Sequence, residues 1–269
     1  ALIRERMADK SSTTVIGIIS GKGGVGKSVV AVNTATLLSK LGKQVALVDA
    51  DLSNPSISLH LGLSYTPIGI QEVLSGKNKA IDGLIIHPLT GLRVLPASLK
   101  YKPEATLKNL KSVVKTLDAY DYVIIDSPPG ITEDVEHILE ACDRIVIVTT
   151  PDIPSITSAS KIVSLCKDVK TEVAGIIANR VTNSNYELSE KEIESMSEVS
   201  VICDIPEDDS VPASIAARLP VVLYKPHSGA SQKLKVAALQ LSGGALEGGL
   251  DYSFISRTLN WFKRLLRLG

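Results

Sequence analysis

Cysteine is scarce in this chain: its 269 residues include only Cys142, Cys166 and Cys203. The three lie far apart with no C-x-x-C pair, which argues against a disulfide framework or a cysteine-ligated metal and favours reduced, mostly buried thiols. The formal net charge is zero, so neither disorder nor a surface that coats nucleic acid is indicated. There is no N-terminal apolar signal and no apolar run long enough to span a bilayer. We therefore expect a cytoplasmic protein with one large α/β domain.

Aromatic residues are also few, and they are unevenly placed. Both phenylalanines and the only tryptophan lie in residues 254–269. The same segment carries four cations and no acidic residue, so the rest of the neutral chain has a net charge of about −4. A core without Phe or Trp, followed by a tail that holds them all, indicates a separate role for the tail.

Short apolar runs alternate with helical stretches over residues 13–241. This pattern predicts a doubly wound, mostly parallel sheet with helices on both faces, whose ligands bind beyond the carboxyl ends of the strands. Strands are expected at residues 15–20, 44–48, 122–126, 144–148, 172–178 and 199–203, with a hairpin or an extra edge strand at 84–86 and 92–95. Residues 1–12 are expected to be disordered, residues 242–253 to form a flexible glycine-rich linker, and residues 254–269 a separate helix.

A glycine-rich segment follows the first expected strand and leads into a helix at 29–41. It reads Gly21-Lys22-Gly23-Gly24-Val25-Gly26-Lys27-Ser28 and matches the phosphate-binding pattern G-x-x-x-x-G-K-[ST] in its strand–loop–helix context. The glycines allow backbone N–H groups to surround phosphate oxygens at the helix N-terminus. We expect Lys27 to reach the β- and γ-phosphates of a nucleotide and the Ser28 hydroxyl to ligate Mg²⁺. The alternative is a glycine-rich turn that matches by chance.

Three aspartates follow expected strands. Asp126 opens the segment Asp126-Ser127-Pro128-Pro129-Gly130, where a carboxylate can hold Mg²⁺ or a water bound to it. A turn or helix-capping aspartate is the alternative. Asp49 and Asp51 lie two residues apart after the second strand and share a face while the chain stays extended. One can help to position the metal and the other can orient the attacking water, and the residues alone do not separate these roles.

Lys22 is not required by an ordinary phosphate-binding loop, and a solvated surface lysine is the simple alternative for it. With Lys22, the loop resembles the deviant K-G-G-x-G-K-[ST] motif of the MinD/ParA group of P-loop ATPases, and the resemblance covers residues 15–241. It implies a Mg²⁺-dependent ATPase that forms a homodimer with ATP between the subunits. In such a dimer Lys22 would cross the interface to the phosphates of the other subunit's ATP. The resemblance also gives Asp51 the water-activating role and Asp49 the metal-side role.

The same resemblance implies a pocket for the adenine base. Ala178-Asn179-Arg180-Val181 and Ile205-Pro206-Glu207-Asp208 match family segments that contact adenine, which assigns Asn179, Arg180, Pro206, Glu207 and Asp208 to this pocket. Taken alone, the second segment is equally compatible with a strand-to-helix turn and a capping aspartate.

Residues 254–269 form two faces at helical spacing. The apolar face holds Phe254, Ile255, Thr258, Leu259, Trp261, Phe262, Leu265, Leu266 and Leu268, and the polar face holds Ser256, Arg257, Asn260, Lys263, Arg264 and Arg267. Such a basic amphipathic helix is typical of segments that lie in the interface of an anionic membrane. A helix docked on its own domain or on a partner is the alternative. MinD proteins likewise end in a membrane-targeting helix.

These features together predict a nucleotide-switched positioning ATPase. The ATP-bound homodimer would hold anionic lipids through two tails, and hydrolysis would release it from the membrane. It would act with an unidentified activator or cargo in placing the division site or another cellular structure, with a regulator of surface-organelle placement as one alternative.

Two further alternatives come from related groups. Asn54-Pro55-Ser56 and the Pro128-Pro129 pair look closer to Mrp-type iron–sulfur carriers, yet the chain lacks their C-terminal C-x-x-C. A ParA-type partition ATPase would need a basic surface for nucleic acid, which the charge of the domain disfavours, so nucleic acid is not an expected partner.

Overall fold

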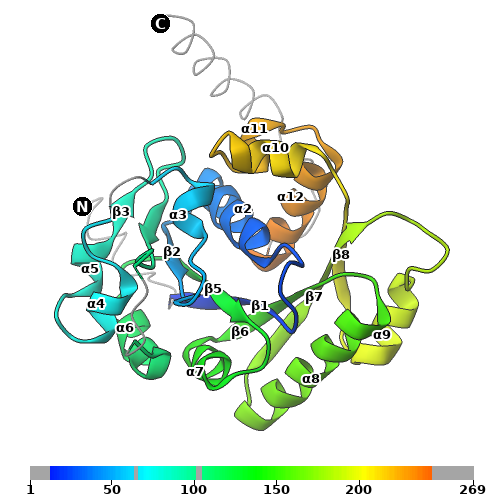
Figure 1. The fold of residues 1–269 in the computed structure, drawn as a ribbon, viewed down its shortest axis with the longest axis horizontal. Helices are drawn as coiled ribbons and strands as arrows, with labels where there is room; N and C mark the ends of the chain where they lie inside the picture. The colour runs from blue at the N-terminus through cyan, green and yellow to red at the C-terminus, as the bar shows by residue number, and fades with distance from the viewer. Residues whose placement is uncertain (1–12, 64–65, 101–104, 244–269) are drawn as a thin grey trace, which may run out of the picture.

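A single eight-stranded sheet organises the part of the chain that the computed structural model describes, namely residues 13–63, 66–100 and 105–243. Its strand order is β3-β4-β2-β5-β1-β6-β7-β8, and every neighbouring pair is parallel except β3 and β4 (Figure 1). The strands are β1 (Thr14–Ser20), β2 (Val45–Asp49), β3 (Ile85–Ile86), β4 (Arg93–Leu95), β5 (Tyr122–Pro129), β6 (Arg144–Thr149), β7 (Glu172–Val181) and β8 (Val201–Pro206). The predicted mostly parallel sheet is confirmed, and the segments at 84–86 and 92–95 form the hairpin β3–β4.

Helices cover both faces of the sheet, because the central strands are apolar on both sides. One face packs on α2 (Lys27–Lys40), α3 (Ile57–His60), α10 (Ser210–Ala216), α11 (Val221–Tyr224) and α12 (Gly229–Leu241). The other packs on α4 (Ile70–Leu74), α5 (Ala80–Gly83), η1 (Leu107–Asn109), α6 (Leu110–Lys115), α7 (Glu133–Ala141), α8 (Ile153–Val169) and α9 (Glu190–Ser197).

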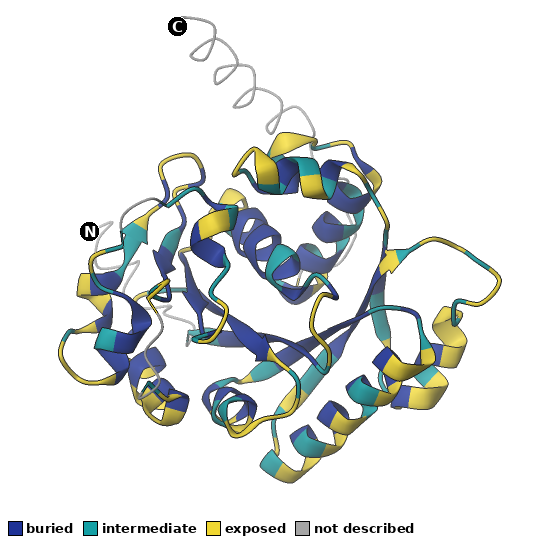
Figure 2. Cartoon of the chain, in the orientation of Figure 1, coloured by how far each residue is buried: buried dark blue, intermediate teal, exposed yellow. Residues whose placement is uncertain are grey.

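Alternation along β1 shows how the sequence makes these two layers. Ile16 and Ile18 join the core beneath α2 and α12, whereas Val15 and Ile19 join the core beneath α7 and α8. Successive side chains of a strand point to opposite faces, so a continuous apolar run becomes a strand buried on both sides. Figure 2 shows the buried residues following the sheet between the two helical layers.

The carboxyl ends of the central parallel strands meet at one edge, which brings distant sequence motifs together. The register pairs Asp49 at the end of β2 with Asp126 in β5, and the glycine-rich loop leaves β1 beside them. No helix within the described ranges is long and apolar enough to cross a membrane. The expectations for residues 1–12 and 254–269, and for all but the first two residues of the linker expected at 242–253, lie outside the described residues.

Candidate nucleotide-binding site

The glycine-rich loop connects β1 to α2 at the carboxyl edge of the sheet. Gly24 and Gly26 have φ values of +80° and +91°, in the left-handed region that favours glycine. Gly26 is the N-cap of α2 and supplies no side-chain cap, so the first N–H groups of this 14-residue helix stay available for another acceptor. A helix N-terminus with such uncapped donors is a ready anion-binding site.

Two other elements hold this loop in place. A Cβ on Gly26 would lie 2.2 Å from Nδ2 of Asn179, at the end of β7. A Cβ on Gly21 would lie 2.6 Å from Cβ of Ser158 in α8. Real Cβ atoms do not approach other atoms this closely, so the loop can pack against both neighbours only because these positions are glycine.

Lys27 and Asp126 form a buried ion pair beneath the loop. Lys27 Nζ lies 2.8 Å from Asp126 Oδ1, and the two side chains are 7% and 0% exposed. The second carboxylate oxygen, Asp126 Oδ2, is buried and has no hydrogen-bond partner among the described residues. An unpaired buried carboxylate oxygen is costly, so it marks a place where a cation or water belongs.

Asp49 lies next to Asp126 in the sheet and is fully buried. Its Oδ1 accepts the Asp51 N–H at 3.2 Å, and its Oδ2 accepts those of Ser56 and Ile57 at 3.2 and 3.1 Å. Burial, followed by the charge of Asp126, raises the pKa of Asp49 well above its usual range, although the N–H groups of Ile57 and Asp51 oppose the shift. Asp49 therefore orders the loop from β2 to α3, and its role toward a metal stays a prediction.

Asp51 lies on the same loop and is 6% exposed. Its Oδ1 accepts the Ser53 hydroxyl and the Asn54 N–H, both at 2.9 Å. Oδ2 receives no hydrogen bond from the residues that the structure describes. Oδ1 thus fixes the orientation of the carboxylate.

A pocket of about 290 Å³ opens beside the loop, between the ends of β7 and β8 and the starts of α2, α10 and α12. It brings together the predicted base-site residues Asn179, Arg180, Pro206, Glu207 and Asp208 with Gly24 and Gly26. Sequence reasoning missed its apolar walls, which are formed by Val29, Val30, Ile205, Val211, Pro212, Ile215, Ala230 and Leu234. A planar base fits a site with apolar walls and a few polar groups.

Asn179 and Arg180 connect this pocket to the phosphate loop. Asn179 Nδ2 donates to the Val25 carbonyl at 2.6 Å. Arg180 Nε donates to Glu207 at 2.7 Å, and its Nη1 reaches the Gly24 carbonyl at 3.4 Å. The ends of β7 and β8 are therefore tied directly to the loop.

Asp208 uses both oxygens within the protein. Oδ1 accepts the Ser210 N–H at 2.9 Å and Oδ2 accepts the Ala230 N–H at 3.0 Å, so the carboxylate joins the starts of α10 and α12. Burial acts to raise the pKa of Asp208, but hydrogen bonds from Ser210 and Ala230, with one from Ser228, outweigh it and lower the pKa to about 2. Asp208 therefore stabilises the turn into α10, whose N-cap residue is Asp209, and it also lines the pocket.

Lys22 is exposed at the outer part of the loop and forms no ion pair within the described ranges. Its charge acts on Asp152 at the start of α8. Asp152 caps that helix through the Ser155 N–H at 3.0 Å and accepts the Thr150 hydroxyl. Lys22 is therefore accessible to a second molecule, unlike the buried Lys27.

Comparison with known proteins gives a consistent result. A ParA-group family model described as a NUBPL iron-transfer P-loop NTPase matches residues 11–241. An uncharacterized ATP-binding protein of Methanocaldococcus jannaschii is 38% identical over 248 residues, which cover 90% of this chain and 94% of the relative. The septum site-determining protein MinD of Thermotoga maritima is 30% identical over 271 residues, covering 94% and 98% of the two chains.

A solved structure extends the comparison to three dimensions. MinD of Pyrococcus horikoshii OT3, complexed with Mg-ADP, superposes with a TM-score of 0.80 at 29% identity. The match covers 85% of this chain and 96% of that one. The similarity therefore extends over nearly all of the domain described above.

Proposed function

The chain belongs to the ParA/MinD family of P-loop NTPases, and from this we propose that it is an ATPase that dimerises around ATP and then attaches to a membrane. It is related to septum-site-determining proteins. In our proposal the cycle of ATP binding and hydrolysis places the division site or another cellular structure. The observation that carries the proposal is the pairing of buried Lys27 with Asp126 beneath a loop that exposes a second lysine, Lys22.

The residues present fit ATP together with Mg²⁺. Lys27 would hold the β- and γ-phosphates, while the uncapped N–H groups of α2 surround them. Asp126, whose Oδ2 has no hydrogen-bond partner among the described residues, would hold the metal together with Ser28 and Asp49. When bound, Mg²⁺ neutralises charge on the phosphates during phosphoryl transfer. Asp51 would orient the attacking water through its second carboxylate oxygen.

The pocket beside the loop would receive the adenine. Asn179 and Arg180 are already fixed to the loop carbonyls of Val25 and Gly24, so they can position the base relative to the phosphates. Pro206 and Glu207 would border the base, and the apolar side chains of α2, α10 and α12 would pack against its ring. Asp208 would support this wall by holding the two helix starts.

The exposure of Lys22 supports the dimer part of the proposal. Its side chain could reach the phosphates of a second subunit that faces the same edge of the sheet. Dimer formation would therefore depend on bound ATP, and hydrolysis would remove the phosphate charge that Lys22 contacts.

The tail supplies the membrane part of the proposal. A single short helix holds a membrane only marginally, whereas two linked helices raise avidity by roughly 10²–10⁴. The basic face of residues 254–269 suits anionic headgroups, and Trp261 and Phe262 suit the acyl boundary. Attachment would therefore depend on dimerisation, and so on ATP.

Sedimentation with vesicles tests this function. The full chain, with ATP and Mg²⁺, should pellet with vesicles that contain phosphatidylglycerol and should stay in the supernatant with ADP. A variant that ends before Phe254 should dimerise with ATP but fail to pellet. Equal pelleting of the truncated and full chains would show that the tail is a packing or partner helix.

Iron transfer is a second candidate, because the matching family model carries that description. The three cysteines argue against it. Burial raises the pKa of the Cys166 thiol to about 11 and that of Cys203 to about 12, whereas a cluster needs thiolates. Iron and sulfide analysis of anaerobically purified protein decides between the two candidates, and stoichiometric iron with sulfide would favour the carrier.

A further inference from the structure

Two helices carry the chain from the base pocket to the opposite edge of the domain. Both helices begin at the pocket, where Val29 in the first turn of α2 and Ala230 in the first turn of α12 line it. The helices pack against each other, and α2 ends where the chain turns into β2. Leu241 is the last residue of α12, and Arg144 is the first residue of β6. The Leu241 carbonyl accepts a hydrogen bond from the Arg144 guanidinium at 2.7 Å. Both helices therefore end at the edge where the parallel strands begin.

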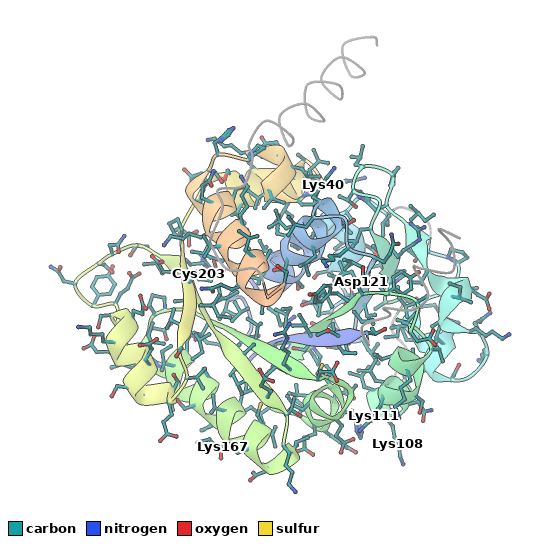
Figure 3. All side chains as sticks on the ribbon, turned by 180° about the vertical axis from the view of Figure 1, so that it is seen from behind. Lys40, Lys108, Lys111, Asp121, Lys167 and Cys203 are labelled. Carbon is teal, nitrogen blue, oxygen red and sulfur yellow. The ribbon has the colours of Figure 1, made fainter. Side chains whose placement is uncertain are left out.

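The end of α2 meets the β3–β4 turn at this edge. Ser39 Oγ lies 3.4 Å from the Thr90 carbonyl, which joins the two segments. Together they expose a set of residues that we call the corner surface: Lys40, Leu41, Lys43 and Leu89. Figure 3 shows Lys40 at the end of α2, close to that turn.

The corner surface combines exposed aliphatic side chains with cations. Leu41 is 41% exposed and Leu89 37%. Lys40 and Lys43 are exposed, and neither forms an ion pair within the described ranges. The neighbouring carboxylate of Asp121 is engaged by the Gln44 N–H at 2.7 Å.

The place where the chain leaves the domain lies near this surface. β2 and β6 are separated by β5 and β1, so these two strands are three strand spacings apart, or roughly 14 Å. The end of α2 lies at β2 and the end of α12 at β6. In the sequence, 12 residues (242–253) separate Leu241 from the basic amphipathic segment 254–269.

We propose that the corner surface is a second contact with the anionic bilayer that the tail binds. Aliphatic side chains that flank lysines can enter the headgroup region while the cations meet anionic lipids. The inference rests on the proposed membrane attachment and adds to it that the domain itself touches the lipid.

The test compares two charge reversals in the full chain. Lys40→Glu/Lys43→Glu removes the cations of the corner surface. Lys161→Glu/Lys191→Glu makes the same change on α8 and α9, which lie on the other face of the sheet. All four lysines are exposed and outside the nucleotide site, so ATP hydrolysis in solution should be unchanged in both variants.

Partition is measured with ATP and Mg²⁺ on phosphatidylglycerol-containing vesicles and on vesicles of phosphatidylcholine alone. The corner variant should lose about 25-fold or more of its partition onto the anionic vesicles, because each of the two basic residues near the surface contributes roughly fivefold. The control should stay within about twofold, because charges beyond a Debye length are screened. High salt should remove the difference between wild type and the corner variant.

The outcomes separate this inference from the proposed function. A wild-type chain that fails to bind anionic vesicles would overturn the proposed function, and the inference with it. Wild-type binding that is equally strong in the corner variant would overturn only the inference. If the corner variant binds vesicles normally but loses affinity for a DNA duplex, the surface is a nucleic-acid contact and the bilayer proposal is wrong.

Discussion

Gly26→Ala, compared with Gly24→Ala, gives a sharp test of how the phosphate loop is built. Both glycines lie in the same loop with positive φ values, +91° and +80°. They differ in what a new Cβ would meet. At Gly24 nothing lies within 4 Å, whereas at Gly26 the Asn179 amide nitrogen lies at 2.2 Å.

The expected magnitudes follow from this difference. Alanine in the left-handed region costs roughly 1–2 kcal/mol, so Gly24→Ala should lower the free energy of unfolding by about that much. Gly26→Ala has the same backbone cost and also displaces Asn179, whose amide donates to the Val25 carbonyl at 2.6 Å. A buried polar group left unpaired costs about 1–3 kcal/mol more, which gives a total of roughly 2–5 kcal/mol.

Urea unfolding of the nucleotide-free proteins measures both changes in the free energy of unfolding. Thermal melting is a second readout, because each kcal/mol should lower the Tm of a domain of this size by about 2–4 °C. The clash should be relieved in an Asn179→Ala background, where Gly26→Ala should cost no more than Gly24→Ala does. Equal destabilisation of the two single variants would show that the close approach of Asn179 adds nothing to the cost of Gly26→Ala. A cost of Gly26→Ala that does not change when Asn179 is replaced would show the same.

Three other predictions concern chemistry, pH and the tail. Isothermal titration should show that Lys27→Ala abolishes ATP binding, because the phosphates lose their main cation, whereas Asp51→Ala binds ATP and fails to hydrolyse it. Asp208 has a pKa lowered to about 2, so the stability it contributes is present above about pH 4 and is lost as the pH falls toward 2. Because Asp208 is partly exposed, we expect this contribution to the free energy of unfolding to be only about 1–2 kcal/mol. Asp208→Asn should remove it, which acid unfolding of both proteins would measure. Trp261→Glu should release the protein from all vesicles, whereas Arg264→Glu should weaken binding to anionic vesicles only, as added salt should.

The fold could be predicted because its signals are local. The strands are continuous apolar runs, and the loop from Gly21 to Ser28 has a spacing that few other structures require. The pocket walls could not be predicted in the same way. Leu234 and Ile205 have the spacing of ordinary core residues, and only the tertiary arrangement leaves them facing a cavity.

Long-range polar contacts were also beyond sequence reasoning. Arg180 reaches the Gly24 carbonyl across 156 residues of chain, and no local pattern encodes that contact. The spacing of Asp49 and Asp51 predicted a site role for Asp49, which stays a prediction, but it gave no sign that the Asp49 carboxylate accepts the N–H groups of Ser56 and Ile57. Those bonds depend on the path of the loop between β2 and α3, which the sequence pattern leaves open.

In the proposed cycle, ATP joins two subunits and Lys22 acts across their interface. Size-exclusion chromatography with light scattering on hydrolysis-deficient Asp51→Ala measures this assembly. With ATP and Mg²⁺ this variant should have the mass of a dimer, and with ADP that of a monomer. Adding Lys22→Ala should return it to a monomer while ATP binding by titration persists. A dimer that forms equally well without the Lys22 side chain would rule out the cross-subunit role of Lys22, and an Asp51→Ala protein that stays monomeric with ATP would rule out the ATP-bridged dimer.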